Sequence, residues 1–482
     1  MSFEIDPSFV TVACDEYCLK VADGTHDSPK QTSNGKLLVT SKNVKDGRLL
    51  LDSAYFISDE DYAEINRRSK VDQWDLLLTM IGTVGETCIV SQSDPIFAIK
   101  NVGLLKCGTE LRAKWLYYLL RSPQGQQLIE QRKKGSTQQY ISLTEIRNFP
   151  VSYPSNELEM QGAVSVLSLL DDRITLLRET NATLEAIAQA LFKSWFVDFD
   201  PVRAKAEGRA RQDGERSGQP RMPQASDLPR PGAEAGAEAQ GQPEGAIQGC
   251  MSAAEGRMPK AAMDATTAAL FPDSFEESEL GLVPKGWAVR SLDSIADYLN
   301  GLALQKFPPS EDSWLPVIKI AQLRKGDTVG ADRAGRNIKP EYVIQNGDVL
   351  FSWSGSLEVV IWCGGEGALN QHLFKVTSAE FPKWFYYLWT RHHLPDFQQT
   401  AASKATTMGH IQRKHLTEAK VVVPSAEVLQ EAGAFIAPLL DRWLSNAEQA
   451  QTLTQLRDTL LPRLISGQLR LPEAEATVEE VL

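Results

Sequence analysis

The most constraining feature of this sequence is a long stretch in which apolar residues recur with the spacing of a coiled-coil seam. Residues 163–200 contain neither Gly nor Pro, so nothing in the sequence interrupts a helix there. The seam positions are separated alternately by four and three residues, the a/d pattern of a heptad repeat; they are Leu170, Ile174, Leu177, Asn181, Leu184, Ala188 and Leu191. A helix with such a stripe must bury it against a partner. Trp195 and Phe196 follow the seam, and Pro201 is expected to end the helix.

A second apolar stripe near the C-terminus is a candidate partner. It lies within residues 427–464 and comprises Leu440, Leu444, Ala447, Leu453, Leu456, Leu460 and Leu464. Either stripe could instead pack against its own globular domain. Asn181 has two interpretations: a polar residue that fixes the helix register, or a residue at a wet edge of the seam. The second stripe offers no evident Asn to pair with it.

The segments that precede the two stripes also match each other, at an offset of about 270 residues. Asp75-Leu-Leu-Leu-Thr corresponds to Asp348-Val-Leu-Phe-Ser, and Trp115-Leu-Tyr-Tyr-Leu corresponds to Trp384-Phe-Tyr-Tyr-Leu. Ser136-Thr-Gln-Gln-Tyr-Ile likewise corresponds to Thr406-Thr-Met-Gly-His-Ile. The order of these matches predicts a tandem duplication, globule–helix–globule–helix. Strands are expected at 37–40, 76–80 and 87–90, and helices at 111–121 and 122–133.

Composition limits the other possibilities. No apolar run is long enough to span a membrane and no signal peptide precedes the first domain, so a cytoplasmic location in a bacterium or archaeon is expected. The six cysteines show no metal-ligand spacing, and no metal is expected. The net charge of −12 lies mainly on the helices and the connecting segment, whereas residues 1–150 carry −1 and residues 286–424 carry +2. Near-neutral globules can have local basic faces, so nucleic acid remains a possible partner.

The predicted domains follow from these patterns. The fold class is α+β. We expect a first globule at 1–152, a first helix at 153–200, a linker and re-entry segment at 201–285, a second globule at 286–424, a second helix at 425–468 and a tail at 469–482. Gly, Pro, Ala and Gln dominate residues 203–262, which predicts a flexible linker.

The sequence resembles the DNA-specificity subunits of Type I restriction–modification systems. The residues that carry the resemblance are 23–29, 75–85, 135–141, 191–202, Gly286-Trp287 and 460–467. It implies two tandem α/β target-recognition domains separated by two long helices that form an antiparallel coiled coil. It also implies a subunit without catalytic activity that binds double-stranded DNA at a split, asymmetric site. Two methyltransferase subunits would dock on the helices, with restriction/translocase subunits attached to them. This subunit would bind no cofactor, while its partners would use S-adenosylmethionine, ATP and Mg²⁺.

Candidate DNA contacts can be chosen by what each side chain can bind. Lys can neutralise phosphates, and Gln can make paired hydrogen bonds to adenine. The first copy offers Lys133, Lys134, Ser136, Thr137, Gln138, Gln139 and Tyr140, and the second offers Lys404, Thr406, Thr407 and His410. Further candidates are Thr25, His26, Lys42, Asn43, Asn370, Gln371 and His372. These segments could equally be solvated loops, and His26 could simply cap a turn.

Enzymatic alternatives have little support in the sequence. Walker, dinucleotide-binding and Asn-Pro-Pro-Tyr-like methylase motifs are absent. Pro395-Asp396 with Glu418 and Lys420 imitates a metal-nuclease pattern, but the first copy lacks it. The alternatives are a stand-alone nuclease or methylase with tandem DNA-binding domains, and a coiled-coil adaptor that does not touch DNA. We expect no catalytic residues in this chain.

Overall fold

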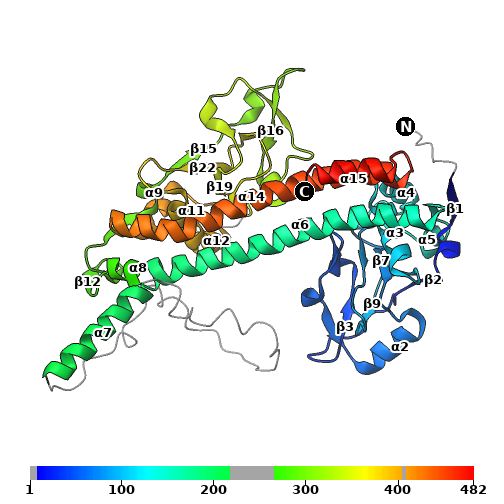
Figure 1. Cartoon of the computed structure of the whole chain (residues 1–482), viewed down its shortest axis with the longest axis horizontal. Helices are drawn as coiled ribbons and strands as arrows, with labels where there is room; N and C mark the ends of the chain where they lie inside the picture. Colours follow the sequence, from blue (N-terminus) through cyan, green and yellow to red (C-terminus); the bar gives the residue numbers. More distant parts are fainter. Residues whose placement is uncertain (1–7, 218–264, 404–408, 482) are drawn as a thin grey trace. The chain divides into compact units, whose positions relative to one another are not determined.

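The computed structural model describes residues 8–217, 265–403 and 409–481. The chain divides into two compact units. Unit 1 consists of Met1–Leu176 and Ala450–Leu482, and unit 2 of Leu177–Gln449. Each unit contains one α/β domain and a part of each of two long helices, α6 (Glu157–Phe192) and α14 (Ala426–Ile465) (Figure 1). The predicted α+β organisation with two tandem domains is confirmed.

Unit 1 is built around an antiparallel four-stranded sheet of order β2-β10-β7-β8. A second sheet, of order β6-β3-β9, pairs β3 and β9 in parallel. All five residues of β7 are buried, as expected for a central strand with a continuous apolar run. The strands are β1 (Phe9–Ala13), β2 (Lys20–Asp23), β3 (Lys36–Val39), β4 (Val44–Lys45), β5 (Arg48–Leu49), β6 (Tyr55–Ile57), β7 (Asp75–Thr79), β8 (Thr87–Ile89), β9 (Phe97–Ile99), β10 (Val102–Lys106) and β11 (Pro150–Pro154).

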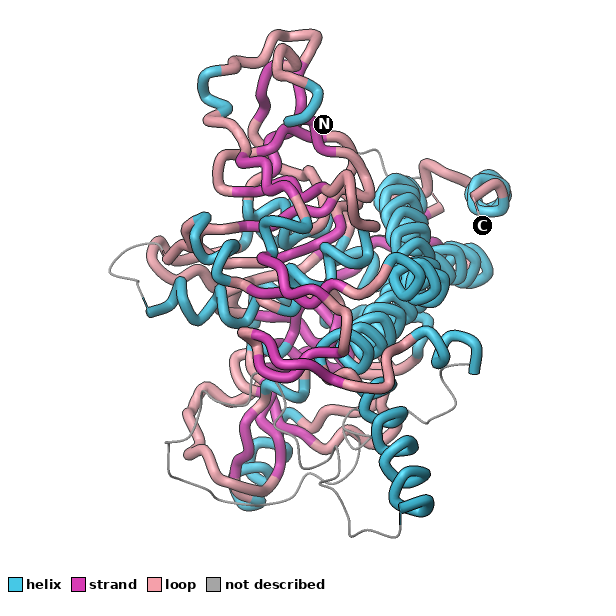
Figure 2. The backbone as a smooth tube through the Cα atoms, turned by 90° about the vertical axis from the view of Figure 1, so that its left-hand side faces the viewer, coloured by secondary structure: helices cyan, strands magenta, loops and turns pink. Residues whose placement is uncertain are grey.

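Unit 2 repeats this plan, which confirms the duplication. Its antiparallel sheet has the order β15-β22-β19-β20, and a parallel pair, β16 and β21, again lies in a second sheet. The strands are β12 (Phe275–Ser278), β13 (Gly281–Pro284), β14 (Ala288–Ser291), β15 (Asp297–Asn300), β16 (Trp314–Ile318), β17 (Arg333–Gly335), β18 (Val343–Ile344), β19 (Val349–Ser352), β20 (Val359–Ile361), β21 (Gly367–Leu369), β22 (Leu373–Thr377) and β23 (Lys420–Val423). Helices and strands are distinguished by colour in Figure 2.

Several of the shorter helices begin directly after a Ser or Thr residue that caps the first turn. Thr109, Ser122 and Ser142 each accept a hydrogen bond from the backbone N–H three residues later, at the starts of α3, α4 and α5. The helices of unit 1 are α1 (Cys14–Tyr17), α2 (Asp59–Ser69), α3 (Glu110–Arg121), α4 (Pro123–Arg132), α5 (Leu143–Arg147) and α15 (Leu471–Glu479). Those of unit 2 are α7 (Asp200–Ser217), α8 (Ala265–Leu270), α9 (Leu292–Ile295), α10 (Ile320–Lys325), α11 (Lys383–His392), α12 (Leu394–Ser403) and α13 (Arg413–Glu418).

In unit 1, α6 runs antiparallel to the chain of α14 and α15. Gly162 near the start of α6 lies against Leu471, whereas Asp171 further along accepts a hydrogen bond of 2.7 Å from Arg457. Tyr118 of α3 donates to the same carboxylate over 3.1 Å. Burial acts to lower the pKa of Arg457, but Asp171 and Asp458 outweigh it and raise the pKa above its ordinary value. An ion pair therefore ties the two helices together beside the α/β domain.

Unit 2 shows the same arrangement with other residues. The Trp195 and Phe435 ring centroids lie 5.8 Å apart, and Asn446 of α14 contacts Asn181 earlier in α6, so the helices again run in opposite directions. Tyr387, the counterpart of Tyr118, donates to Glu185 of α6 over 3.3 Å. The predicted antiparallel pairing is thus confirmed within each unit.

Most predicted seam residues are buried. Leu184, Leu444, Ala447 and Leu456 are only partly buried, and the remaining predicted positions are at most 8% exposed: Leu170, Ile174, Leu177, Asn181, Ala188, Leu191, Leu440, Leu453, Leu460 and Leu464. In α14 the buried face passes through Asn446 and Ala450 rather than Ala447. The expectation that no Asn stands opposite Asn181 is therefore wrong, because the buried face of α14 passes through Asn446, one residue before the predicted Ala447.

Asn181 and Asn446 form a polar pair in this otherwise apolar face. The two residues are 8% and 1% exposed. Nδ2 of Asn181 donates to the Trp443 carbonyl over 2.8 Å, and Nδ2 of Asn446 donates to Oδ1 of Asn181 over 3.0 Å. Oδ1 of Asn446 is buried without a hydrogen-bond partner in the structure. The wet-edge interpretation of Asn181 is therefore wrong.

A single substitution in this pair should destabilise the protein more than the double substitution does. Asn181→Leu strands the buried amide of Asn446 and should destabilise the protein by about 1–3 kcal/mol. Combining it with Asn446→Leu removes both polar groups and should recover most or all of that loss. Urea unfolding followed by circular dichroism would measure the difference. Equal losses for the single and double variants would contradict the pairing.

The segment after α6 differs from the prediction. A π-helical turn, Lys193–Val197, follows α6, and Phe199 adopts a φ of 56° before α7 begins. Pro201 does not end α6; it stands in the first turn of α7, where its missing N–H costs no hydrogen bond. Residues 201–217 are helical rather than part of a flexible linker, because Ala, Arg, Glu and Gln favour helix. The rest of the predicted linker, 218–262, lies outside the described residues.

Two further segments have more structure than predicted. The re-entry segment contains α8 and the β12–β13 hairpin, and the predicted tail contains α15. Among the helices of the described ranges, none is both long enough and apolar enough to cross a bilayer.

Candidate nucleic-acid interface

In unit 1, three segments meet where β2 ends, and we call this region tip 1. It comprises residues 23–28, the connection Lys100–Asn101 between β9 and β10, and the loop 134–140. Backbone hydrogen bonds join the first two: Thr25 N donates to Ile99 O over 3.0 Å and Asn101 N to Thr25 O over 3.1 Å. Met80 links them to the loop, because Met80 N donates to Asn101 O over 3.4 Å and Met80 O accepts from Ile141 N over 2.9 Å. Two sets of candidates that are far apart in sequence therefore lie at one end of the domain.

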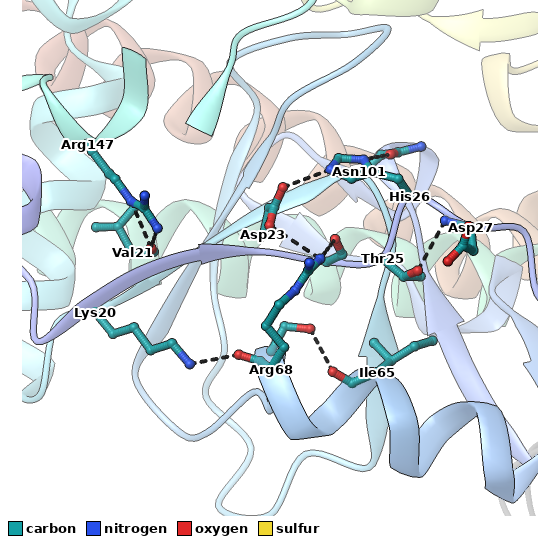
Figure 3. A network of polar contacts seen from close by, with 12 residues as sticks. Lys20, Val21, Asp23, Thr25, His26, Asp27, Ile65, Arg68, Asn101 and Arg147 are labelled. Carbon is teal, nitrogen blue, oxygen red and sulfur yellow. Dashed lines mark hydrogen bonds and ion pairs between the residues drawn. The ribbon is translucent and has the colours of Figure 1, made fainter. Parts of the chain in front are cut away.

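A chain of polar side chains orders the first part of tip 1 (Figure 3). His26 lies between two partners, with Nε2 2.9 Å from Oδ2 of Asp23 and Nδ1 2.9 Å from Oδ1 of Asn101. Arg68, at the end of α2, approaches the other carboxylate oxygen of Asp23 at 3.5 Å and donates to the Gly24 carbonyl over 2.9 Å. The Asp23 side chain is 12% exposed, whereas those of His26 and Arg68 are 61% and 60% exposed. An exposed imidazole is thus held in one orientation by a nearly buried carboxylate.

The loop 134–140 is a closed turn with outward-facing side chains. Lys134 and Tyr140 exchange two backbone hydrogen bonds, of 2.8 and 2.9 Å. Gly135 has a φ of +90°, and a Cβ at this position would lie 2.4 Å from the Gln138 carbonyl, so the turn requires Gly. The enclosed predicted contacts, Ser136, Thr137, Gln138 and Gln139, are exposed, as is Tyr140.

The two lysines that precede this turn differ in availability. The Lys133 side chain is 12% exposed and forms an ion pair with Glu130. The Lys134 side chain is 53% exposed and lies 3.0 Å from Glu145, and the hydrogen bond to Glu145 raises the pKa of Lys134. Lys134 is therefore better placed than Lys133 to meet a phosphate.

Of the remaining candidates in unit 1, one needs correction. Thr25 is partly buried, and its hydroxyl accepts from Asp27 N over 3.1 Å. Lys42 is exposed. Asn43, by contrast, is 2% exposed, and its Nδ2 donates to Leu50 O and Ser53 Oγ. In this conformation Asn43 ties the turn 41–43 to residues 50–53 and cannot reach a base.

Unit 2 presents an equivalent region, tip 2, with different side chains. Asn300 ends β15 where Asp23 ends β2, and Trp353 follows β19 where Met80 follows β7. Trp353 Nε1 donates to Oδ1 of Asn300 over 3.0 Å. His372 Nδ1 lies 3.0 Å from the Ser354 hydroxyl and its Nε2 lies 3.4 Å from Gln371 Nε2. The β21–β22 connection, 370–372, is one residue longer than the β9–β10 connection.

The predicted residues of tip 2 are only partly brought together. Gln371 and His372 are partly exposed, and His410 is exposed and bridges Ser354. Asn370 is 4% exposed and its side chain accepts from His372 N, so it supports the loop instead of facing outward. Lys404, Thr406 and Thr407 lie outside the described residues.

The nuclease-like pattern of unit 2 lines one surface hollow. Asp396, Glu418 and Lys420 contribute to it. Lys420 is engaged elsewhere, since its Nζ lies 3.2 Å from Glu279. Within the parts of the chain that the structure describes, no group of three His, Cys, Asp or Glu residues is arranged to hold a metal ion.

Sequence reasoning missed Asp23, Arg68, Lys100 and Asn101. Their common environment depends on contacts between distant strands and α2, which no local pattern reports. The sequence could have indicated two of them. The duplication aligns Lys100 and Asn101 with the segment 370–372, whose residues were candidate DNA contacts in the second copy.

Comparison with known proteins identifies the family. A family model described as the Type I restriction modification DNA specificity domain matches residues 29–186 and 284–455. The Type I restriction enzyme HindI specificity subunit of Haemophilus influenzae is 27% identical over 71% of this chain and 73% of its own. The MjaIX specificity subunit of Methanocaldococcus jannaschii is 22% identical over 75% of this chain and 70% of its own. The S subunit from M. genitalium has a TM-score of 0.49 and 14% identity, with coverage of 96% and 97% of the two chains. Because the family model matches more than half of its residues, this chain belongs to the Type I restriction–modification DNA specificity family.

Proposed function

We propose that this chain recognises a bipartite, asymmetric site on double-stranded DNA, one half with each unit, and scaffolds the other subunits of the complex. As a specificity subunit it serves DNA sequence recognition. The observation that carries the proposal is the pair of tips. Both stand at the same place in the repeated fold. In unit 1 the end of β2 meets the connection between β9 and β10, and in unit 2 the end of β15 meets the connection between β21 and β22.

The chemistry of the two tips supports an asymmetric site. Tip 1 presents Asn101 beside His26 and Arg68, which are held around the nearly buried Asp23, while tip 2 has Asn300 and Trp353 on the equivalent backbone. Sequence is read by hydrogen bonds and apolar contacts to base edges. Two different sets of donors and acceptors would select two different half-sites.

The helices supply surface for protein partners. On α6 within unit 1, Leu158, Leu169 and Leu176 are 74%, 50% and 52% exposed, at spacings that place them along one helical face. We propose that the helices dock two methyltransferase subunits, to which the restriction/translocase subunits attach. This chain acts without catalysis and without a cofactor of its own, while S-adenosylmethionine, ATP and Mg²⁺ serve the partner subunits.

Mapping methylated bases in cells that carry the complete system would test the proposal. The expected result is one interrupted recognition sequence with two unlike halves. A continuous site, or two halves related as a palindrome, would overturn the two-reader arrangement. Cutting or methylation of DNA by the purified chain alone would favour a stand-alone nuclease or methylase, and behaviour unaffected by any DNA would favour a coiled-coil adaptor.

The loop 134–140 yields a separate prediction. Gln138→Ala with Gln139→Ala should reduce discrimination within one half-site by about 1–3 kcal/mol, because an amide can make two hydrogen bonds to adenine. Lys134→Ala should instead weaken binding to all sequences and flatten its salt dependence. Competition binding with matched and mismatched duplexes measures both effects. Unchanged sequence preference in the double Gln variant would show that this loop is not a reader.

A further inference from the structure

We propose that Asn101 reads an adenine in the half-site bound by unit 1, and that His26 and Asp23 are positioning residues for its amide. The inference rests on the proposed function and deepens it by assigning one base contact. The ligand is the major-groove edge of an A·T pair, since that edge offers an acceptor beside a donor.

The backbone of Asn101 is held in an unusual conformation. Its φ is 55°, in the left-handed region that Asn tolerates better than most residues. Its N–H donates to Thr25 O over 3.1 Å, and its carbonyl accepts from Met80 N and from the Ser41 hydroxyl, each at 3.4 Å. Three neighbouring segments thus determine the position of one partly exposed side chain, as expected where strain serves recognition.

The side chain is fixed as firmly as the backbone. His26 Nδ1 lies 2.9 Å from Oδ1 of Asn101, and the opposite side of the imidazole is bound by Asp23. The Asp23 carboxylate is nearly buried, and the guanidinium of Arg68 balances its negative charge. This charge therefore does not face the phosphates of a duplex.

The amide retains what a base contact needs. With Oδ1 towards His26, Asn101 keeps one acceptor lone pair and two N–H donors; with the amide turned round, it keeps one N–H and two lone pairs. Either orientation can therefore donate to N7 and accept from the N6 amino group of adenine. His26 itself has both ring nitrogens occupied and is better suited to hold the amide than to read a base.

Unit 2 lacks this arrangement. Asn300 stands in the place of Asp23, and its side chain accepts a hydrogen bond from the indole N–H of Trp353. The β21–β22 connection, which corresponds to the one that contains Asn101, is one residue longer and includes Gln371 and His372. The adenine contact is accordingly assigned to one half-site alone, which gives the test an internal reference.

Asn101→Gly tests the contact without disturbing the backbone, because Gly removes the side-chain amide and adopts a positive φ without strain. The full chain, assembled with its methyltransferase partners, is presented with a randomised duplex library. Preference for A·T should fall by about 5- to 150-fold at one position of one half-site, with the other half-site unchanged. His26→Ala should cause a smaller loss at the same position. Asn148→Ala, at another exposed Asn of unit 1, should leave every position unchanged.

A modified base distinguishes direct contact from structural damage. Replacing the selected adenine by 7-deazaadenine removes the N7 acceptor. Because this replacement removes one of the two hydrogen bonds, it should weaken wild-type binding by a smaller factor than Asn101→Gly does. It should not weaken binding by the Asn101→Gly protein any further. The His26→Ala protein should retain part of the penalty.

The outcomes separate this inference from the proposed function. A wild-type complex without any sequence preference would overturn the proposed function itself. A specific wild-type complex whose preference survives Asn101→Gly, or tolerates 7-deazaadenine at every position, would overturn the assignment of Asn101 alone. Loss of preference in both half-sites would also overturn it, because a single base contact cannot act on both.

Discussion

Leu177→Asp should separate the helix pair and, under the proposed docking of the methyltransferase subunits on the helices, abolish their co-purification. Leu177 is 4% exposed and lies one turn before the Asn181–Asn446 pair. A carboxylate there would be buried without a partner, and such substitutions destabilise by roughly 3–5 kcal/mol. That loss is a large part of the free energy of unfolding of an ordinary domain, which is about 5–15 kcal/mol. Thermal unfolding and affinity co-purification would report the two effects.

The neighbouring residue provides a matched control. Leu176 is 52% exposed on the same helix, so Leu176→Asp introduces the same charge without burying it. Its melting temperature should stay close to that of the wild type. Loss of the methyltransferase subunits from Leu176→Asp without loss of stability would place the docking surface on the outer face of α6. Equal melting temperatures for Leu177→Asp and the wild type would contradict the buried seam.

The sequence predicted the parts of the fold that depend on local periodicity and on the duplication. Leu170, Leu177 and Ala188 could be recognised because a heptad seam repeats every few residues, whatever lies opposite. Asn446 was overlooked for the converse reason, since its significance depends on the residue that faces it from another helix. The helix at 200–217 was overlooked because Gly and Pro nearby suggested a linker, whereas Pro in a first turn favours helix.

The candidate interface was predictable to a smaller extent. Residues 136–140 stood out because Gln and Thr beside Lys suit DNA, and all are exposed. At the rest of tip 1, His26 was a candidate, but its partners were not apparent, because Asp23, Arg68 and Asn101 come from three separate segments. Asn43 shows the opposite error: residue type alone marked it as a reader, although its amide is bound by Thr40, Leu50 and Ser53.

A fragment of residues 1–200 should form a homodimer that recognises an interrupted palindrome. It retains tip 1 and all of α6 but lacks residues 450–482, which complete unit 1. Leu453, Leu460 and Leu464, each at most 4% exposed, would be missing from its core. The exposed apolar face would then favour association with a second copy.

The spacing of the seam suits such self-pairing. Leu177 and Leu184, Ile174 and Ala188 stand at nearly equal distances on either side of Asn181. Two antiparallel copies of α6 centred on this residue would therefore align apolar with apolar and Asn181 with its own symmetry mate. Asp171 would lose Arg457, so the dimer should be less stable than the intact helix pair.

Two-fold symmetry determines the DNA site of that dimer. Each copy presents tip 1, in opposite orientations, so both half-sites should become the one proposed for unit 1 of the intact chain. Sedimentation at micromolar concentration would detect the dimer, and methylation mapping with the methyltransferase subunits would give the sequence. The Asn181→Leu variant of the fragment tests the role of the polar residue. It should still dimerise, but its helices should also pair in registers other than the symmetric one. A monomeric fragment, or a dimer that keeps the asymmetric site of the intact chain, would contradict the assignment of one reader to each unit.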